Sequence, residues 1–588
     1  MKPHDMGVLF DECAERQLGT RVHLDRPFDI DADARTHHTL PQLATLVREA
    51  AGWLDAAGAG PGDRVAIVKD NHWDYDLLAC AAVRVGAVPA QLSAHLSGRT
   101  LGTLLARLGP ALLVTTAQVL QRGRTEGTDL ASAARATLVL DGAVPGALGM
   151  DDVRGHTAPG PRRRHDDEPL VIHHTSGTTG VPKLVVHSTR TIVGKLARFE
   201  SVRLPRIGLR RTDVLANASA FAHGRTFCWT ASALCMGPSA ISIITTQDPN
   251  LADPVLRAHP PTVLEALPAS LVRLLPLTEG LDNPFRRVRM VISTYDAVHP
   301  PTVRAYLGAS RHRSPVWVEG WGQTETGPLT FRFHTRRSVR RAPDGAGTRN
   351  LGRPVPVKTR LRVVDPDTHR PLPRGQAGLV LARTAACALG YVGEEDRWSA
   401  KRHGGWWNTG DIGARNRDGS VELLDREVDR AARLSCLRTE DLLEDRLPQA
   451  MECVVLAEPG RDRCPSWSPP TARWTGPAGR RRCATCRRCA NRSHSPGTRY
   501  RVPAPARCGA GSCCTASPDG PTPTAPAGGP ETDVDLRRTW ACDERGPARG
   551  RRETPCTTAW AGTRGTSSTT TACTATSCTA ASPTRTTR

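Results

Sequence analysis

The chain is organised around one stretch, Thr175-Ser176-Gly177-Thr178-Thr179-Gly180-Val181-Pro182-Lys183. Two glycines and four hydroxyl residues fill its first six positions, a mixture that favours neither a helix nor a strand. Glycine turns freely, so the backbone N–H groups of such a loop can point toward an anion, with the hydroxyls as extra donors. Lys183 adds a positive charge at the exit. The stretch therefore predicts a loop that holds the phosphates of a nucleotide, with an ordinary surface turn as the alternative.

The residues before this loop predict an α/β fold. Leu170-Val171-Ile172 is a short apolar run typical of a buried strand. Further upstream, apolar residues at helical spacing alternate with short apolar runs. This alternation predicts a largely parallel sheet with helices on both faces. The expected helices are 43–58, 75–85 and 101–108, and the expected strands are 63–68, 87–90 and 111–114.

Two later segments carry side chains suited to a nucleotide. Trp321-Gly322-Gln323-Thr324-Glu325 combines a flat aromatic ring, a hydroxyl donor and a carboxylate. An aromatic face can pack on a base, and a carboxylate oxygen is the kind of ligand that Mg²⁺ prefers. Asp411 follows a glycine and, when ionised, can accept two hydrogen bonds from a ribose diol. Its alternative role is that of a turn residue.

In this order, these segments resemble the signatures of the adenylate-forming superfamily, which includes acyl-CoA synthetases, aryl-acid ligases, luciferases and peptide-synthetase adenylation domains. The resemblance covers residues 1 to about 457. It implies a large N-terminal AMP-binding domain over 1–424, of parallel and mixed sheets covered by helices, with a β-rich closing part. Residues 425–459 would form the hinge and the start of a small, truncated C-terminal domain.

The resemblance also implies a function. An ATP-dependent ligase of this type joins a small carboxylic acid to AMP, releases pyrophosphate and passes the acyl group to the thiol of coenzyme A. The alternatives are transfer to phosphopantetheine on an acyl carrier protein, a stand-alone adenylation domain in a biosynthetic pathway, and a catalytically impaired ATP-binding remnant. The identity of the acid and the oligomeric state stay open.

Residue roles follow from the same resemblance. The phosphates of ATP would lie against the loop from Thr175 to Gly180 and Lys183, and Thr324 would meet the α-phosphate. Glu325 would bind Mg²⁺, and Trp321 would pack on adenine beside Gly322 and Gln323. The remaining roles are ribose contacts for Asp411 and Arg426, an acyl-pocket and gating position for His223, and a hinge position for Asp429.

One segment departs from the family pattern. After the predicted strand 288–293, most relatives have a glycine-rich turn that lets the acyl group and adenine approach the backbone. This chain has Tyr295 and Asp296 there. Tyr295 could narrow the pocket or offer a stacking face, and the sequence does not decide between the two.

Composition sets the last part of the chain apart. Residues 461–588 hold 21 of the 79 Lys and Arg, 8 of the 58 Asp and Glu, and 11 of the 18 Cys. Leu, Ile, Val and Phe are represented there only by Val502, Val534 and Leu536. So few apolar side chains cannot bury a core, and we expect a disordered tail from 460 to 588. We expect no nucleic-acid partner, because that idea would rest on this tail alone, and no metal site at Cys483-x-x-Cys486-x-x-Cys489.

An out-of-frame origin explains the tail better than a function does. Excess Arg, Pro, Ala, Gly, Thr and Cys without Lys or Phe is what GC-rich coding DNA gives in a shifted frame. Translation from the third base of each codon makes residues 498–513 compatible with E-V-P-R-T-G-T-G-K-V-R-R-R-E-L. That string resembles the family's C-terminal segment P-R-T-x-x-G-K-x-x-R, whose lysine contacts the acyl carboxylate and the phosphate. We therefore expect the printed chain to lack this lysine and to adenylate poorly.

The sequence predicts a cytoplasmic location for the protein. No window has the eighteen or more apolar residues that a membrane span needs. Acidic residues around the first short apolar run (Asp5, Asp11 and Glu12) argue against a secretory signal. The seven cysteines before residue 461 have no paired spacing, which fits a reducing cytoplasm.

Overall fold

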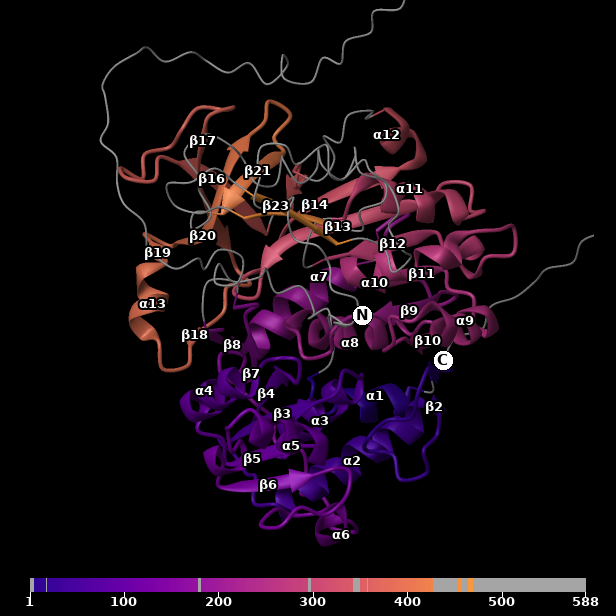
Figure 1. Ribbon diagram of the computed structural model, residues 1–588, viewed down its shortest axis with the longest axis vertical. Coiled ribbons are helices and arrows are strands. Elements are labelled where there is room, and N and C mark those ends of the chain that lie inside the picture. Colours follow the sequence, from indigo (N-terminus) through magenta and orange to yellow (C-terminus); the bar gives the residue numbers. More distant parts are fainter. Residues whose placement is uncertain are drawn as a thin grey trace, which may run out of the picture. The chain divides into compact units, whose positions relative to one another are not determined.

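The computed structural model is an α/β protein with two large sheets and a smaller one (Figure 1). It describes residues 5–16, 18–177, 181–202, 204–294, 298–341, 349–356, 358–426, 452–456 and 464–468. The predicted fold class is confirmed over this part of the chain. The predictions for the hinge residue Asp429 and for most of the tail lie outside the described residues.

The N-terminal sheet has seven strands in the order β18-β8-β7-β4-β3-β5-β6. Strands β4, β3, β5, β6 and β7 run parallel, and β8 returns antiparallel to β7 across the phosphate-loop stretch. The predicted strands in this region are confirmed, with ends that differ by a few residues. The bounds are β3 (Arg64–Lys69), β4 (Val88–Ser93), β5 (Leu112–Thr115), β6 (Ala136–Val139), β7 (Pro169–His174), β8 (Leu184–Ser188) and β18 (Gly390–Tyr391).

The second sheet has nine strands in the order β15-β14-β13-β12-β11-β9-β10-β1-β2. Its central strands are parallel, whereas β14, β15 and β2 pair antiparallel at the two ends. The bounds are β1 (Arg21–Leu24), β2 (His37–Thr39), β9 (Val214–Ala218), β10 (Ala240–Ile243), β11 (Val263–Ala266), β12 (Met290–Ser293), β13 (Val316–Gln323), β14 (Gly327–Thr335) and β15 (Arg353–Pro354).

Helices between the two sheets share one buried core with both. That core includes Val65 and Val171 from the seven-stranded sheet, Leu215 from the nine-stranded sheet, and Tyr75 and Phe227 from the helices. Burial of such side chains is the main stabilising contribution, at roughly 1.5–3 kcal/mol each. The helices of this layer are α1 (Leu9–Glu15), α2 (Leu40–Ala56), α3 (Asp74–Arg84) and α8 (Gly224–Met236).

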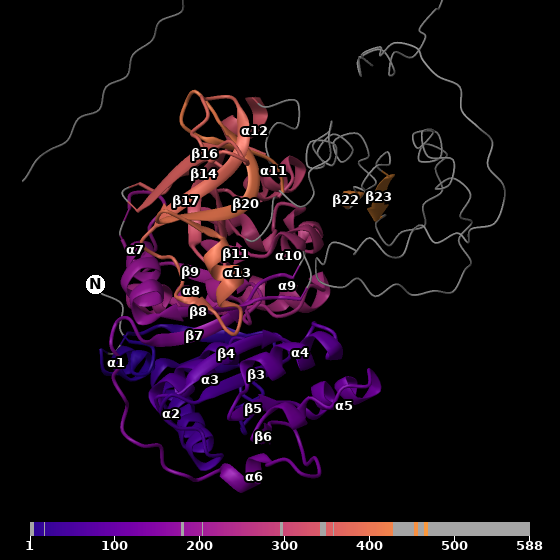
Figure 2. The same cartoon turned by 90° about the vertical axis from the view of Figure 1, so that its left-hand side faces the viewer.

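The outer faces of both sheets are also covered, as expected for largely parallel sheets. Leu101 and Leu105 of one helix pack on the seven-stranded sheet, and Leu256 and Leu307 of two others pack on the nine-stranded sheet. Figure 2 shows these helices beside their sheets. The bounds of these and the remaining α-helices are α4 (Gly98–Leu108), α5 (Ala117–Thr125), α6 (Met150–Val153), α7 (Arg198–Glu200), α9 (Pro249–Ala258), α10 (Pro268–Arg273), α11 (Pro300–Ala309), α12 (Arg336–Arg341) and α13 (Glu395–Ala400).

A five-stranded antiparallel sheet follows in the chain and forms the predicted β-rich closing part. Its long central strand β20 pairs with β17, β19 and β21. The bounds are β16 (Thr359–Val364), β17 (Ala377–Thr384), β19 (Arg402–His403), β20 (Trp406–Arg415) and β21 (Val421–Arg426). Among the described residues, no helix is both long enough and apolar enough to cross a membrane.

A two-stranded ladder lies at the end of the described part of the chain. Strand β22 (Glu452–Leu456) pairs antiparallel with β23 (Cys464–Ser468), and the second of these strands falls within the stretch expected to be disordered. A two-stranded ladder needs only backbone hydrogen bonds, so it does not require the buried core that the composition of this stretch rules out. The other residues of the tail lie outside the described residues, and their disorder stays a prediction.

Candidate nucleotide-binding site

The phosphate-loop stretch connects two neighbouring antiparallel strands. Strand β7 ends at His174, which lies opposite Leu184 at the start of β8. The backbone N–H of Thr175 donates to the carbonyl of Lys183 at 3.0 Å, and the N–H of Lys183 donates to Thr175 Oγ1 at 3.0 Å. These bonds close the neck of the loop. Ser176 is exposed, and Gly177 has φ +70°, a conformation that favours glycine. Thr178, Thr179 and Gly180 lie outside the described residues.

Lys183 and Glu325 meet at one side chain, Tyr391 of β18. Lys183 Nζ lies 5.8 Å from the centre of the Tyr391 ring, and the Tyr391 hydroxyl donates to Glu325 Oε1 at 2.6 Å. Burial lowers the pKa of Lys183, and the Glu325 carboxylate opposes that change. Burial and the neighbouring Glu325 raise the pKa of Tyr391, which keeps the phenol protonated as a donor. The phosphate loop and the later carboxylate therefore share one corner.

Glu325 fits the role of a Mg²⁺ ligand. Its side chain is only 7% exposed, and one of its oxygens is fixed by Tyr391. A carboxylate offers about four acceptor positions, so this bond leaves capacity for a metal. The backbone also holds the residue, because Ala388 N–H donates to the carbonyl of Glu325 at 2.8 Å.

Gln323 ties the aromatic-Gly-Gln-Thr-Glu segment to the five-stranded sheet. Gln323 Nε2 donates to Asp411 Oδ2 at 3.2 Å and to the carbonyl of Thr409 at 2.5 Å. The indole N–H of Trp407 donates to Gln323 Oε1 at 3.0 Å. Asp411 lies directly opposite Arg426 on neighbouring strands, with Arg426 Nε 3.4 Å from Asp411 Oδ1. Asp411 is 2% exposed and Arg426 40% exposed, so the carboxylate of this pair is buried and the arginine side chain reaches solvent.

The backbone at Gly322 and Thr324 is fixed. A β-bulge lies between Trp321 and Gly322, and a Cβ at Gly322 would come within 2.1 Å of the Gly327 carbonyl oxygen. Only glycine fits there. The carbonyl of Thr324 accepts from His187 Nε2 at 2.7 Å. Trp321 packs on the core of the closing sheet, and its contact with adenine stays a prediction.

Two histidines of this region, His187 on β8 and His223 before α8, are uncharged at neutral pH. His223 caps the N-terminus of α8, where its Nδ1 accepts from the backbone N–H of Arg225 at 3.2 Å. Burial, assisted by His174 and Arg225, lowers the pKa of His223 to about 3. Burial lowers the pKa of His187 to about 4. At neutral pH these rings therefore donate and accept hydrogen bonds without adding positive charge.

Next to His223, a buried ion network supports the predicted pocket region. Arg225 Nε and Nη2 donate to Glu265 at 2.7 and 2.9 Å, and Arg225 Nη1 donates to both oxygens of Glu200 at 2.6 Å. Burial raises the pKa of Glu265, and Arg225 opposes this effect. No sequence motif marked these residues, because their partners lie far apart in the chain. Tyr295 and Asp296, the other predicted pocket residues, lie outside the described residues.

The structure brings five of the described predicted residues into two linked groups. Lys183 and Glu325 form one, and Gln323, Asp411 and Arg426 form the other; both contain residues of the 321–326 segment. Sequence analysis missed Tyr391 and Trp407, which connect them. An aromatic residue in a strand carries no signal of its own, so only the fold could find them.

Comparisons with known proteins give the same result as the motifs. The sequence profile of the family described as AMP-binding enzyme matches residues 10–392. A 3-amino-2-hydroxy-4-methoxybenzoate diazotase from Streptomyces cremeus is 37% identical over 481 residues, which cover 78% of this chain and 85% of that protein. A 3-aminoavenalumate diazotase from a Streptomyces species is 26% identical over 434 residues, 71% of this chain and 73% of that protein.

A solved structure shares the fold. The crystal structure of an anthranilate CoA ligase in complex with anthranoyl-AMP matches with a TM-score of 0.68 at 18% identity, covering 82% of this chain and 90% of that one. At this identity the match concerns the fold alone. Together with the profile match, it confirms the resemblance drawn from the motifs between residues 175 and 426.

Proposed function

Because this chain belongs to the AMP-binding enzyme family of adenylate-forming ligases, we propose that it activates a small acid with ATP and Mg²⁺ and then transfers the activated group to an acceptor. In the first step an acid oxygen attacks the α-phosphorus of ATP. The bond from that phosphorus to the bridging oxygen of the β-phosphate breaks, and pyrophosphate leaves. The product is a mixed anhydride of the acid and AMP.

The observation that carries this proposal is the arrangement around Gln323 and Glu325. Glu325, fixed by Tyr391, would hold Mg²⁺ beside the phosphate loop and Lys183, while Asp411 and Arg426 would meet the ribose. Nucleotidyl transfer depends chiefly on positioning and on stabilisation of phosphate charge. Mg²⁺ supplies charge neutralisation on the phosphates when bound, and these side chains supply orientation.

One candidate for the second step is the thiol transfer that the motifs imply. The sulfur of coenzyme A or of a carrier-protein phosphopantetheine attacks the acyl carbon of the adenylate. The acyl–oxygen bond to AMP breaks, AMP leaves, and the thiol proton passes to solvent. The acid is then a small carboxylic acid.

We favour a second candidate, diazotisation of an aromatic amine, because the two Streptomyces relatives are diazotases named for amino-substituted acids. A diazo group needs one more nitrogen at the oxidation level of nitrite. Nitrite is itself an acid oxyanion that can attack the α-phosphorus. The aryl amine nitrogen then attacks the nitroso nitrogen, AMP leaves, and the N-nitroso product takes up a proton and loses water to give the diazonium ion.

One experiment separates the two acceptors. The chain is incubated with ATP, Mg²⁺ and either a panel of carboxylic acids with coenzyme A, or nitrite with 3-aminobenzoates. Pyrophosphate release reports activation, loss of free thiol reports the first candidate, and an azo dye formed with an aromatic coupling agent reports the second. If no pyrophosphate is released with either set of substrates, the proposed activation itself is rejected.

The assay should compare the printed chain with a frame-corrected one. We propose that the printed chain binds ATP but releases pyrophosphate slowly, because the lysine of the P-R-T-x-x-G-K-x-x-R segment is missing from it. Sequencing the coding DNA across codons 456–466 tests the frameshift directly. Equal activity of both chains would show that this lysine is not required.

A further inference from the structure

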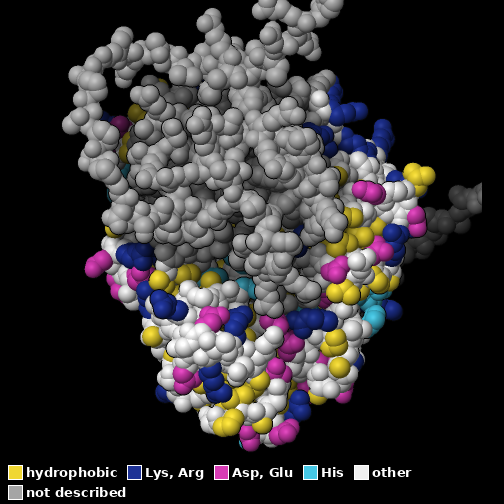
Figure 3. Space-filling view, in the orientation of Figure 1, with side chains coloured by type: hydrophobic (Ala, Val, Ile, Leu, Met, Phe, Trp, Pro, Cys, Tyr) yellow, Lys and Arg dark blue, Asp and Glu magenta, His cyan; other side chains and the backbone are white. Residues whose placement is uncertain are grey.

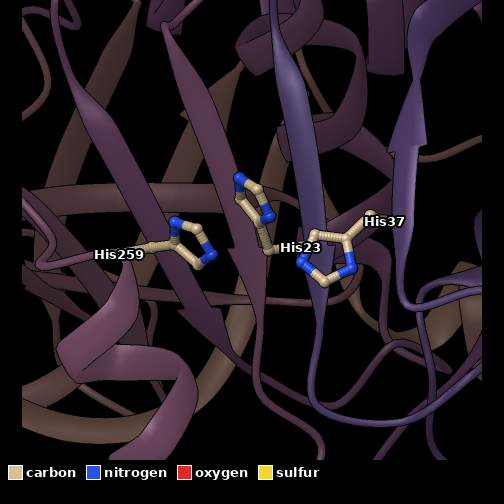
Figure 4. A group of neighbouring side chains, drawn as sticks. All are labelled: His23, His37 and His259. Carbon is tan, nitrogen blue, oxygen red and sulfur yellow. The ribbon is translucent and has the colours of Figure 1, made fainter.

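Three histidines from separate segments converge at the far end of the nine-stranded sheet. His23 lies on β1, His37 on β2, and His259 directly after α9 (Figure 4). One ligand nitrogen from each lies within 4.8 Å of the other two. The rings of His23 and His259 are stacked with centroids 3.4 Å apart, and the ring of His37 meets that of His23 edge-on at 5.0 Å. We call these three residues the histidine cluster.

The backbone fixes this convergence. His23 and His37 are direct partners in the antiparallel β1–β2 ladder, which places both side chains on one face of the sheet. His259 is held at the end of α9, where its N–H donates to the carbonyl of Val255 at 2.9 Å. The cluster is therefore a product of the fold, and it does not depend on a flexible loop.

The ring nitrogens are suited to a ligand. Among the described residues, the buried Nδ1 of His23 has no hydrogen-bond partner, which is costly for a polar atom. The hydroxyl of Thr36 lies 3.0 Å from Nδ1 of His37 and can fix that ring with Nε2 as the remaining ligand atom. Burial and the neighbouring His259 and His37 lower the pKa of His23 to about 4, and burial lowers that of His259. The uncharged ring is the form that binds metals.

We propose that His23, His37 and His259 bind one divalent transition-metal ion, with Zn²⁺ as the best fit. Three imidazoles suit Zn²⁺, and tetrahedral geometry leaves a fourth position for water. Tetrahedral nitrogens at about 2.0–2.1 Å from the metal are about 3.4 Å apart, and the ion lies close to the plane of each imidazole that binds it. Because the His23 and His259 rings are stacked in nearly parallel planes, one of them must turn out of the stack to share an ion with the other. The partly exposed His259 ring and the exposed His37 ring can make this rotation. Figure 3 shows histidine side chains reaching the surface where Figure 1 places α9 and β2, which gives the ion a path from solvent.

The site is separate from the nucleotide site and has a structural role. Strands β12, β11, β9 and β10 lie between β1 and β13, so at about 4.8 Å per strand the two sites are roughly 24 Å apart. A bound ion would tie the β1–β2 ladder to the segment after α9. It would stabilise the folded state by mass action without entering the reaction. Arg21, which also lowers the pKa of His23, opposes a cation and limits the affinity.

The test uses the full-length chain, freed of metal and titrated with Zn²⁺ and with Co²⁺. Single variants His37→Asn and His259→Asn remove one ligand each, and His165→Asn, at an exposed position, is the matched control. Co²⁺ distinguishes this site from the 11 cysteines of residues 461–588, because thiolate complexes add strong near-ultraviolet absorption that imidazole complexes lack.

We expect the wild type and His165→Asn to show a Co²⁺ visible spectrum without thiolate absorption, and to gain thermal stability from Zn²⁺. Either cluster variant should bind Zn²⁺ at this site about 100-fold more weakly or worse. ATP-dependent pyrophosphate release should not follow Zn²⁺ occupancy. The proposal is overturned if the cluster variants take up as many ions as the wild type with the same affinity and the same Co²⁺ spectrum.

Discussion

The candidate nucleotide site and the histidine cluster lie toward different ends of the nine-stranded sheet. They differ in whether their polar side chains have hydrogen-bond partners. In the nucleotide site, Gln323, Asp411 and Glu325 are all engaged with protein partners. In the cluster, His23 Nδ1 has no partner among the described residues. In the nucleotide site, protein partners position the side chains that would meet the ligand, so removal of one member should disturb the others. In the cluster, the lone pair of His23 Nδ1 has no such partner, and a ligand would bind through it.

The comparison also shows that a low pKa does not mark a metal site by itself. Burial lowers the pKa of both His187 and His23 to about 4. Both nitrogens of His187 have hydrogen-bond partners, at Thr324 and Thr191, so its ring is a structural link. His23 has the same depressed pKa with one nitrogen unpaired. Hydrogen bonding, and not the pKa, separates the two roles.

The largest expected effect comes from breaking the ion network beside the nucleotide site. Arg225→Met leaves the buried Glu265 and the partly buried Glu200 as neighbouring carboxylates without their cation. We expect a loss of about 3–5 kcal/mol in the free energy of unfolding, measured by urea denaturation. Arg154→Met, which removes an exposed pair with Asp151, is the control and should change stability by less than about 0.5 kcal/mol. Equal losses in both variants would contradict the assignment of a tightly coupled network.

The next effect concerns pH. The pKa of His187 falls from 6.5 in the unfolded chain to about 4 in the folded protein, because burial favours the neutral ring. Between these values the unfolded state binds more protons, so stability is complete above pH 6.5 and declines as the pH falls toward 4. The contribution is roughly 3 kcal/mol. Melting temperatures from pH 7 to 4 should fall less steeply in His187→Gln than in the wild type. Parallel profiles would argue that His187 is charged in both states.

Asp411 should have the largest effect on activity. Asp411→Asn removes the charge that holds Arg426 and meets the ribose in the proposal, while the shape is kept. Loss of such a charged hydrogen bond costs about 1.5–3 kcal/mol, which corresponds to roughly 10- to 100-fold slower pyrophosphate release at low ATP in the frame-corrected chain. The exposed Asp151→Asn serves as the control. An unchanged dependence on ATP concentration would remove Asp411 from the nucleotide site.

Much of the fold could be predicted because local patterns determine it. The helical spacing at residues 43–58 predicts a helix, and the apolar run at 111–114 predicts a strand. Both elements are present, as α2 and β5, within a few residues of the predicted ends. The order of strands in each sheet could not be predicted in the same way. It depends on contacts between distant segments, such as β8 of the phosphate-loop hairpin pairing with β18 more than 200 residues later.

The same distinction between local patterns and long-range contacts applies to the residues of the candidate site. Gln323, Glu325 and Asp411 lie in short motifs, so the sequence could point to them. Tyr391 and Arg225 matter only through partners 66 and 40 residues away, respectively, and no local pattern carries that information. The histidine cluster is the hardest site to predict from sequence, because His23 and His259 are far apart in the chain and come together only in the folded protein.

Glu325 and Tyr391 allow a finer test of the site. Glu325→Gln keeps an acceptor for the Tyr391 hydroxyl but removes the charge on the Mg²⁺ ligand. Tyr391→Phe keeps the charge and removes only the hydroxyl that positions it. In the frame-corrected chain, we expect the Mg²⁺ concentration for half-maximal pyrophosphate release to rise about tenfold or more in Glu325→Gln, and about two- to fivefold in Tyr391→Phe. The reverse order would mean that Tyr391, and not Glu325, governs the metal.

The smallest effect is expected at the histidine cluster without metal. In the presence of a chelator, His37→Asn should change the free energy of unfolding by less than about 0.5 kcal/mol, because His37 is exposed and its hydrogen bond with Thr36 is a surface contact. With Zn²⁺, the wild type should become more stable while the variant does not, so the difference between them appears only with the ion. A loss above about 1 kcal/mol in the chelator would mean that the edge-on contacts of the neutral His37 ring with the other two rings already stabilise this edge of the sheet. The contrast between a satisfied network and unsatisfied lone pairs would then fail at this site.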